Sequence, residues 1–427
     1  MELVGQIIIW IMMTFLLVGA FAYMFLPKSG YAVEFKEGIL TMGHIFIPVA
    51  GMMGIIPLLV PLIEATIGPV YLWMHSDPSI AVSTLLPSDQ GAYALSLDIA
   101  ASHGAWIQAF TVSLTSGAVI AFSIPVGLAM LRKVDHKYMA LGTMSGLLSI
   151  PFASFFMSLL LMQSGVPLRE GLDTSSAGSR PFDLSIGEVL LNLVPLIIFM
   201  VVLALLLRFA QGFTVKAFLV FGKVILYVTT ISMALNVVEY FTGVFSTIFG
   251  GWPLQPFIAD EENQFRAMEV VGYIGVMLAG AFPMIYALRK LVGWILRKAG
   301  RGGESHSESV VAGYLAGATN VLALFRIVQL MPARHKVMTI AFSASAGFAL
   351  GDYLAFTAAF QPNMIVAMII GKIGGGVVGA LIALWLAVPF ANRLEQRDLD
   401  AGVEVVAELE GESEAVLEAE QEPRPSL

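Results

Sequence analysis

The chain has 427 residues, of which 57% are hydrophobic and only 13% are charged, and its mean hydropathy is +0.82. A soluble domain carries about 25% charged residues, so this composition excludes an ordinary soluble protein and indicates one that lies in a membrane. Outer-membrane β-barrels alternate in segments of about 10 residues, and this sequence shows no such alternation. Because the chain has no cysteine, disulfides and thiolate metal sites are excluded as well.

The net charge of −8 comes from one end of the chain. Residues 393–427 hold 11 acidic and 3 basic side chains, and the acids and bases of the remaining chain balance. The segment has no aromatic residue, so it lacks the apolar surface that a packed core needs. We therefore expect a single transmembrane domain at 1–392, followed by an acidic, disordered, cytoplasmic tail at 393–427.

Long apolar segments divide the predicted transmembrane domain. The first, 4–26, has no charged residue over 23 positions, where about 20 suffice to cross a bilayer. No basic region precedes it and no small-residue cleavage site follows, so we predict a retained span rather than a signal peptide. Eleven apolar segments are predicted in all: 4–26, 38–63, 78–101, 104–131, 138–162, 184–209, 215–245, 267–290, 308–331, 336–361 and 363–389.

The two halves of the chain share a pattern. A shift by 230 positions superposes small residues of the two halves: Ser113 on Ser343, Gly117 on Gly347, and Gly146 on Gly376. The order and spacing of four apolar segments match as well. We predict an internal repeat, with repeat one at about 38–163, repeat two at about 267–390, and extra helices at 4–26, 184–209 and 215–245.

Basic residues in the loops indicate how the repeats are oriented. The loops at 64–77 and 102–103 carry no Lys or Arg and 132–137 carries three, whereas the matching loops of the second half show the reverse. Lys and Arg favour the cytoplasmic side, so the repeats are predicted to be inverted. This requires 78–101 and 308–331 to enter and leave by one face. The cytoplasmic loops then hold 16 Lys and Arg against 3 outside, compared with about 10 against 9 if every segment crossed.

The geometry of these two segments agrees with re-entrant hairpins. Each arm has about 11 residues, or roughly 16 Å of helix, which is half of a bilayer core of about 30 Å. Both segments break in the middle, at 86–91 and at 316–320. Irregular backbone inside a membrane must be buried in protein or line a wet cavity. We predict an all-α polytopic membrane protein with inverted structural repeats, two re-entrant helical hairpins and about nine full spans, with its N-terminus outside and its C-terminus inside. This is the architecture of a transporter.

Asp89, Asp352 and Lys372 are charged residues deep in apolar segments. A charge at the bilayer centre costs about 2.5–3.5 kcal/mol on the lenient insertion scale, so such residues are functional candidates. Asp352 follows Gly347 and Gly351, which loosen the helix around it. The alternative is a structural ion pair of Asp352 with Lys372 or Arg326. Lys372 is accordingly predicted as a counter-ion for an aspartate, or as a coupling residue.

Polar residues at the two hairpin tips are candidates for ligand binding. Ser88 and Asp89 follow a proline, and Thr319 and Asn320 lie at the second tip. Each also suits the role of a helix cap, and the sequence leaves both interpretations open. Ser-x-x-x-Gly at 113–117 and at 343–347 is more typical of helix packing. Ser123, in the Phe-Ser-Ile-Pro stretch that follows, is a candidate for lining the transport path.

Several stretches together resemble a known family. They are FKEGILTMG (35–43), DPSIAVSTLLPSDQGAYAL (77–95), FSIPVGL (122–128), KYMALG (137–142), FALGDYLAF (348–356) and MIIGKIGGG (368–376). In this order they resemble the EutH ethanolamine permease family. Its members carry Cys-Asp where this chain has Ser88-Asp89, a paired Asn where it has Thr319-Asn320, and no such long acidic tail. The resemblance implies a bacterial inner-membrane permease that takes up ethanolamine for ammonia-lyase catabolism, often in bacteria that form microcompartments.

An amine substrate agrees with these residues. Ethanolamine is a cation at neutral pH, as an amine with a lysine-like pKa is, so Asp352 or Asp89 is the expected counter-charge. Its hydroxyl needs a neutral partner, and an aromatic ring offers a cation–π face. The candidates for the hydroxyl are Asn320, Thr319, Ser88 and Ser123, and those for the cation–π contact are Tyr93, Phe348 and Tyr353.

Other functions are weighed against this one. A carrier for choline, an amino acid or another small polar solute has the same architecture. An intramembrane aspartyl protease is a distant alternative, because Leu-Gly-Asp at 350–352 departs from the Gly-x-Gly-Asp motif of those enzymes. We expect a transporter and no enzyme, with no cofactor, no metal and no nucleic-acid partner. The sequence leaves open whether a proton or sodium ion is coupled to transport and whether the chain forms a homo-oligomer.

Overall fold

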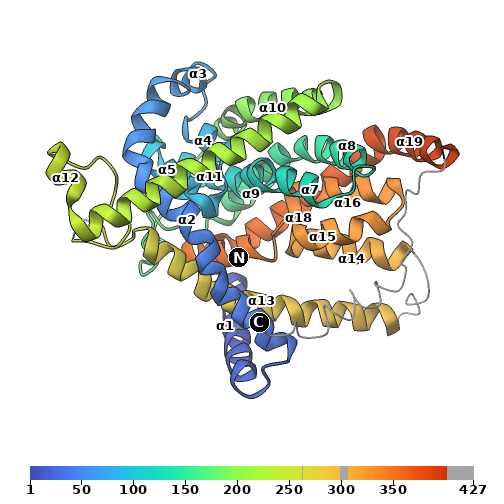
Figure 1. The fold of residues 1–427 in the computed structure, drawn as a ribbon, viewed down its shortest axis with the longest axis horizontal. Helices are drawn as coiled ribbons and strands as arrows, with labels where there is room; N and C mark the ends of the chain where they lie inside the picture. Colours follow the sequence, from blue (N-terminus) through green and yellow to red (C-terminus); the bar gives the residue numbers. More distant parts are fainter. Residues whose placement is uncertain (262, 299–305, 402–427) are drawn as a thin grey trace.

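The computed structural model describes residues 1–261, 263–298 and 306–401. This part of the chain is almost entirely helical, with one isolated β-bridge between Leu168 and Arg180, and the helices form one bundle (Figure 1). Seven helical stretches in it are long and apolar enough to cross a membrane. They are α1 (Glu2–Phe25), α2 (Gly30–Ala65), α8 (His136–Leu147) with α9 (Ile150–Ser164), α10 (Ile186–Phe209), α11 (Gln211–Thr242), α13 (Ala267–Lys298), and α18 (Ile365–Ile382) with the π-helical turn η5 (Ala383–Ala387) and α19 (Val388–Asp400).

The two other predicted spans, 104–131 and 336–361, are each interrupted. The first consists of α6 (His103–Ser113), a turn, the π-helical η2 (Ala118–Ser123) and α7 (Ile124–Met130). The second consists of α16 (Ala333–Ala346), a turn at 347–351 and α17 (Asp352–Phe360). Phe348 has a φ of 59°, a left-handed conformation that ends a helix. Neither segment is therefore a regular α-helix from end to end.

The segments predicted as hairpins are also broken, at the predicted positions. The first contains α4 (Ser79–Leu85), the 3-10 turn η1 (Ser88–Gln90) and α5 (Ala92–Ile99). Its arms pack against each other, and Ser83 and Ser96 are hydrogen-bonded across them at 2.8 Å. Gly91 has a φ of 97°, which a residue with a side chain rarely adopts. The second contains α14 (His306–Thr319), α15 (Val321–Ile327) and the 3-10 turn η3 (Val328–Leu330).

The helices of the two halves occur in the same order and at matching positions. α2, α4, α5, α6, α7 and α8 correspond to α13, α14, α15, α16, α17 and α18, and each begins within about eight residues of a shift of 230. α2 and α13 pack along each other. The two short helices α3 (Gly68–Trp73) and α12 (Val244–Phe249) lie at one end of the bundle, and α19 lies at the other (Figure 1).

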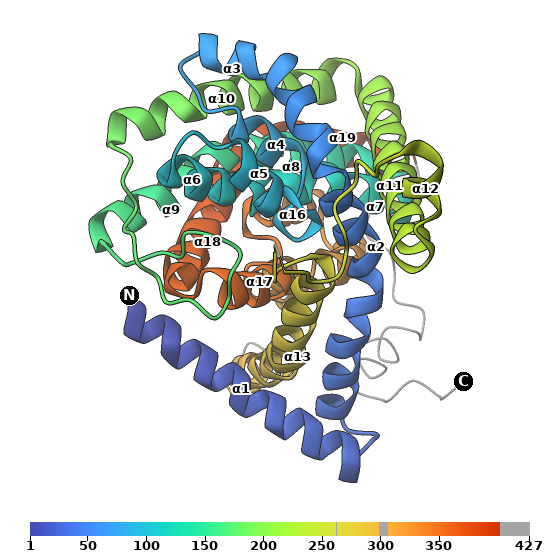
Figure 2. The ribbon, with the colours of Figure 1, turned by 90° about the vertical axis from the view of Figure 1, so that its left-hand side faces the viewer.

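The centre of the bundle is built on close contacts of small residues. α16 packs against α8 and α18, and α18 also packs against α9. A Cβ on Gly146 would lie 2.4 Å from Cβ of Ala344, and one on Gly376 would lie 2.7 Å from Cβ of Ala346. These distances leave no room for a side chain, so the glycines allow the backbones to approach. In Figure 2, α5, α16 and α17 occupy the middle of the molecule, and α1, α10 and α11 lie at its periphery.

The outer helices present apolar side chains to the surroundings. Phe209 of α10 is 80% exposed and Trp385 of η5 is 79% exposed, as lipid-facing residues are. The C-terminal end differs from the predicted tail in one respect: residues 393–400 continue α19 as helix. Residues 402–427 of the predicted tail lie outside the described residues.

Candidate functional site

Each hairpin tip rests on a glycine of the interrupted helix that follows it. A Cβ on Gly117 would lie 2.3 Å from the carbonyl oxygen of Leu86, and one on Gly351 would lie 2.3 Å from that of Thr319. The backbone N–H of Leu350 donates to the carbonyl of Ala318 at 2.9 Å. At the first tip, hydroxyl groups make the corresponding link: Ser88 and Ser113 are 2.6 Å apart, and Ser116 donates to the carbonyl of Thr84. Tips and broken helices therefore form two matched units.

Asp89 lies on η1 at the first tip. Its Oδ1 is buried and has no hydrogen-bond partner. The predicted alternative was a helix cap, but no side chain caps the N-terminus of α5, and Ser88 bonds to Ser113 instead. Burying an acceptor without a donor costs about 1–3 kcal/mol. The carboxylate therefore has capacity for a donor that the protein does not supply.

The other two charged candidates lie near Asp89. Asp352 is the first residue of α17, which packs against η1, and both Asp352 and Lys372 interact electrostatically with Asp89. Lys372 is 1% exposed, donates to the carbonyl of Leu114 at the end of α6, and lies 4.6 Å from the ring centre of Tyr353. In the described residues neither aspartate forms an ion pair within 4.0 Å. The predicted pairing of Asp352 with Lys372 or Arg326 is therefore not present.

A small pocket adjoins the first tip. Asp89 and Ser88 form its polar part, and the ring of Tyr93 lies in an aromatic wall, 5.5 Å from Phe356 and 5.7 Å from Phe360. The free volume at its centre is about 10 Å³, roughly what one water molecule needs. Asp352 does not line it. The lining residues are Val49, Met53, Ser88, Asp89, Gly91, Tyr93, Ala94, Leu172, Val270, Phe356 and Phe360.

The loop at 165–185, between α9 and α10, covers this pocket and contributes Leu172 to its wall. Figure 2 shows the loop, in green, in front of the helices at this end of the molecule. The Arg169 guanidinium donates to the carbonyl of Ala359 at 2.6 Å, at the end of α17, where a cation is favoured. Gln361 donates to the Tyr93 hydroxyl at 2.9 Å and accepts from the backbone N–H of Arg169 at 3.0 Å. Gln361 therefore connects the pocket wall with the loop.

The remaining predicted residues do not line the pocket. Asn320 is the N-cap of α15 and accepts from the N–H of Leu322 at 2.9 Å. The Thr319 hydroxyl donates to carbonyls of its own helix. Ser123 is 9% exposed on η2, and the ring of Phe348 lies 6.1 Å from that of Tyr353. The second tip thus contains the cap that its sequence suggests.

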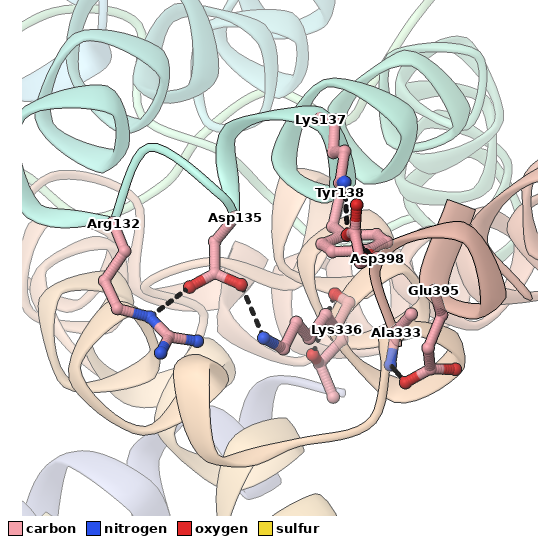
Figure 3. Close-up of polar contacts among 9 residues, drawn as sticks. Arg132, Asp135, Lys137, Tyr138, Ala333, Lys336, Glu395 and Asp398 are labelled. Carbon is pink, nitrogen blue, oxygen red and sulfur yellow. Dashed lines mark hydrogen bonds and ion pairs between the residues drawn. The ribbon is translucent and has the colours of Figure 1, made fainter. Parts of the chain in front are cut away.

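A charged network closes the end of the bundle near α19 (Figure 3). Lys336 of α16 pairs with Asp135 at 2.5 Å, and both side chains are buried, with exposures of 0% and 2%. Asp135 also accepts from Arg132 at 2.8 Å. On α19, Asp398 pairs with Lys137. Because Asp135 lies in the first half of the chain, directly before α8, and Lys336 lies in the second half, on α16, this ion pair links the two halves.

Three residues with structural roles near the site, Gln361, Arg169 and Asp77, were not predicted from the sequence. Gln361 and Arg169 carry no signal in the sequence. Asp77 does have one, because an Asp before Pro-Ser is typical of a helix start. Its Oδ1 accepts from the N–H of Ser79 and its Oδ2 from that of Ala101, both at 2.9 Å. Asp77 therefore joins the two ends of the first hairpin, and Asn192 of α10 accepts from its backbone N–H. In the described residues no cluster of His, Asp and Glu is suited to a metal ion.

Comparisons with known proteins agree with this architecture. The family model for "Ethanolamine utilisation protein, EutH" matches residues 4–386. The chain is 31% identical over 396 residues to the probable ethanolamine permease EutH of Listeria monocytogenes, covering 92% of this chain and 96% of that protein. It is 32% identical to the proteins of the same name in Salmonella typhimurium, over 402 residues, and Escherichia coli K12, over 400 residues, covering 90% of this chain and 95% of each relative. No solved structure matches.

Both the family model and these relatives extend over nearly the whole transmembrane part, including the two tips and the interrupted helices. The chain therefore belongs to the EutH family of ethanolamine utilisation proteins, a family of membrane permeases.

Proposed function

We propose that this protein carries ethanolamine into the cell by alternating access. The observation that carries the proposal is the buried, unpartnered carboxylate oxygen of Asp89 beside the aromatic wall of the pocket. A primary ammonium group has three N–H donors, which satisfy that oxygen. The names of the relatives support ethanolamine as the substrate.

The charges of the site suit one monovalent cation. With Asp89 and Asp352 ionised and Lys372 protonated, the three groups carry one net negative charge, which a single ammonium balances. Lys372 is held by the carbonyl of Leu114 and by the ring of Tyr353, so we assign it a positioning and charge-balancing role. We assign Asp352 as the second carboxylate of the site. Its negative charge adds to the electrostatic attraction of a cation toward Asp89.

We assign the substrate hydroxyl to neutral groups near the tips. Ser88 lines the pocket, and Thr319, Asn320 and Ser123 line the path once the second tip separates from α17. Tyr93 supplies the aromatic face. Phe348 and Tyr353 do not line the pocket, and Lys372 already lies over the ring of Tyr353.

The aromatic rings favour ethanolamine over choline. Tyr93, Phe356 and Phe360 pack against one another, with ring centres 4.7–5.7 Å apart. Rings in mutual contact do not enclose the space that a trimethylammonium group needs, and a quaternary ammonium has no N–H for Asp89. Choline is the second candidate, and competition with labelled ethanolamine separates the two.

The proposed topology follows the charge distribution and the repeat. It has nine spans in the inner membrane, two re-entrant hairpins of opposite orientation, an outside N-terminus and a cytoplasmic C-terminus. The interrupted halves of α6–α7 and α16–α17 suit a substrate site near the midplane, because free helix ends bind ions there. The element-by-element match of the two halves supports the repeat, and the charge distribution of the loops supports its inversion.

Alternating access requires that both ends of the path open in turn. The loop at 165–185 covers the pocket at one end, and the Asp135–Lys336 network closes the other. A free volume of about 10 Å³ is too small for the four heavy atoms of ethanolamine. Entry of the substrate therefore requires the pocket to widen, and we assign the hairpins as the elements that move.

Proteoliposomes that contain only this chain test the proposal, because they exclude metabolic trapping. We expect saturable entry of labelled ethanolamine and faster entry when unlabelled ethanolamine is preloaded. Asp89→Asn should raise the half-saturating concentration about 30-fold or more, since truncating a buried charge pair costs at least about 2 kcal/mol. Asp98→Asn, an exposed carboxylate of the same hairpin, is the matched control. Flux that rises linearly without counterflow would show a channel, and unchanged affinity in Asp89→Asn would remove its assigned role.

A further inference from the structure

Helix α19 has two faces of different charge. On the inner face, Ala391 is buried, Glu395 accepts from the N–H of Ala333 at 3.0 Å, and Asp398 accepts from the Tyr138 hydroxyl at 3.0 Å and pairs with Lys137. These positions are spaced as i, i+4 and i+7, which places them on one side of a helix. The two acids are therefore engaged by the protein itself.

The other face of α19 is exposed and carries two arginines, with Asp400 at its C-terminal end, where it accepts from Gln396 at 3.1 Å. Phe390, Arg393 and Arg397 are spaced as i, i+3 and i+7, and all three are exposed. Arg208, at the end of α10, places its guanidinium 4.2 Å from the ring centre of Phe390, and Arg393 places its own at 4.9 Å. Two cations from helices far apart in the sequence thus share one aromatic ring. We call Arg208, Phe390 and Arg393 the arginine clamp.

The two guanidinium groups of the clamp have no carboxylate partner among the described residues. In the described residues, neither Arg208 nor Arg393 forms an ion pair within 4.0 Å. Its surroundings are apolar, since Phe209 next to it is 80% exposed and Arg208 ends a 24-residue apolar helix long enough to cross a bilayer. The clamp therefore lies where a lipid-facing surface meets water. Two adjacent guanidiniums repel each other unless an anion lies between them.

We propose that the arginine clamp binds the phosphate of an anionic phospholipid headgroup, with the acyl chains along α10 and η5. Guanidinium groups bind phosphate oxygens in a bidentate manner and stack on aromatic rings, and basic sites between membrane helices select anionic lipids. A zwitterionic lipid carries its own cation and gains less from the clamp. This inference does not depend on the transported substrate.

Native mass spectrometry of the full chain in detergent tests the proposal, with phosphatidylglycerol and phosphatidylcholine of the same acyl chains as probes. We expect the wild type to retain phosphatidylglycerol preferentially. The double variant Arg208→Gln/Arg393→Gln should weaken that retention roughly 25-fold, from about fivefold for each arginine at a membrane surface. The matched control is Lys28→Gln/Lys133→Gln, which removes the same charge at two exposed lysines.

Two further measurements make the result specific. Phe390→Leu keeps an apolar side chain but removes the ring, so it should weaken phosphatidylglycerol retention in the same direction by a smaller factor. Inorganic phosphate at the concentration of the lipid should not displace it, because the acyl chains contribute to binding. Equal retention of both lipids by the wild type, an equal loss in the lysine control, or displacement by inorganic phosphate would overturn the proposal.

Discussion

The ammonium group of Lys336 and the carboxylate of Asp135 form an ion pair at 2.5 Å in which both side chains are almost completely buried. The two residues lie 201 positions apart, on α16 and directly before α8. Arg132 of the same turn donates to the same carboxylate, so Asp135 connects the turn before α8 with α16. Charges buried in this way depend on each other, because removing one partner leaves the other without compensation.

The first prediction concerns this pair. Asp135→Asn should lower the free energy of unfolding by about 3–5 kcal/mol, the cost of breaking a buried pair. Asp135→Asn/Lys336→Met removes both charges and should recover much of the loss. Thermal and denaturant unfolding in detergent measures both variants. Asp183→Asn, which breaks the exposed pair with Arg180, is the control and should cost under about 1 kcal/mol. A double variant less stable than Asp135→Asn would show that the pair does not act as a unit.

A second prediction concerns Gly117, the glycine against which the first hairpin tip packs. Gly117→Ala places a Cβ about 2.3 Å from the Leu86 carbonyl oxygen, so the tip must shift. We expect destabilisation of about 1–3 kcal/mol and a loss of ethanolamine uptake larger than the loss of folded protein, because Asp89 moves with the tip. Uptake normalised to folded protein is the readout. Gly222→Ala, where a Cβ meets no atom within 4 Å, is the control and should change neither stability nor normalised uptake. Full normalised uptake by Gly117→Ala would contradict the role of the tip.

A third prediction concerns the base of the same hairpin. Asp77→Asn replaces one acceptor oxygen with a donor that faces an N–H group, so one of the bonds to Ser79 and Ala101 is lost. A hydrogen bond to a charged group contributes about 1.5–3 kcal/mol. Hydrogen exchange should accelerate by about 10-fold or more at amides of α4 and α5, with little change in α13. Asp98→Asn should leave these rates unchanged, and equal acceleration throughout the protein would indicate global destabilisation instead.

The fourth prediction concerns the topology of the hairpins. The chain has no natural cysteine, so a single introduced cysteine is the only thiol of the protein that a labelling reagent can modify. Cysteines at His75 and Ala101, which are exposed at the two ends of the first hairpin, should both react with an impermeant reagent from outside. Cysteines at Ser305 and Arg334, on either side of the second hairpin, should both be protected in intact cells and react after lysis. If either pair reacts from opposite sides, that segment is a full span and the hairpin topology is wrong.

Local features of the sequence determined much of the architecture. Apolar segments and their composition predicted a polytopic helical membrane protein, and the breaks predicted at 86–91 and 316–320 coincide with the ends of α4 and α14. Asn320 caps a helix, as a residue of its type in that position suggests. These predictions succeed because hydropathy, proline, glycine and capping residues act within one or two helical turns.

Tertiary structure decided which groups meet. The sequence marked Asp89, Asp352 and Lys372 equally as candidates. Only the tertiary packing shows that an oxygen of Asp89 is buried without a donor, and that Lys372 contacts the carbonyl of Leu114 and the ring of Tyr353. Gln361 is hydrogen-bonded to Arg169 of the covering loop, and Lys336 is paired with Asp135. Both contacts join residues about 200 positions apart in the sequence. No periodic pattern encodes such contacts, because they depend on how complete helices pack, and the free energy of a buried charge is set by the atoms that surround it in space.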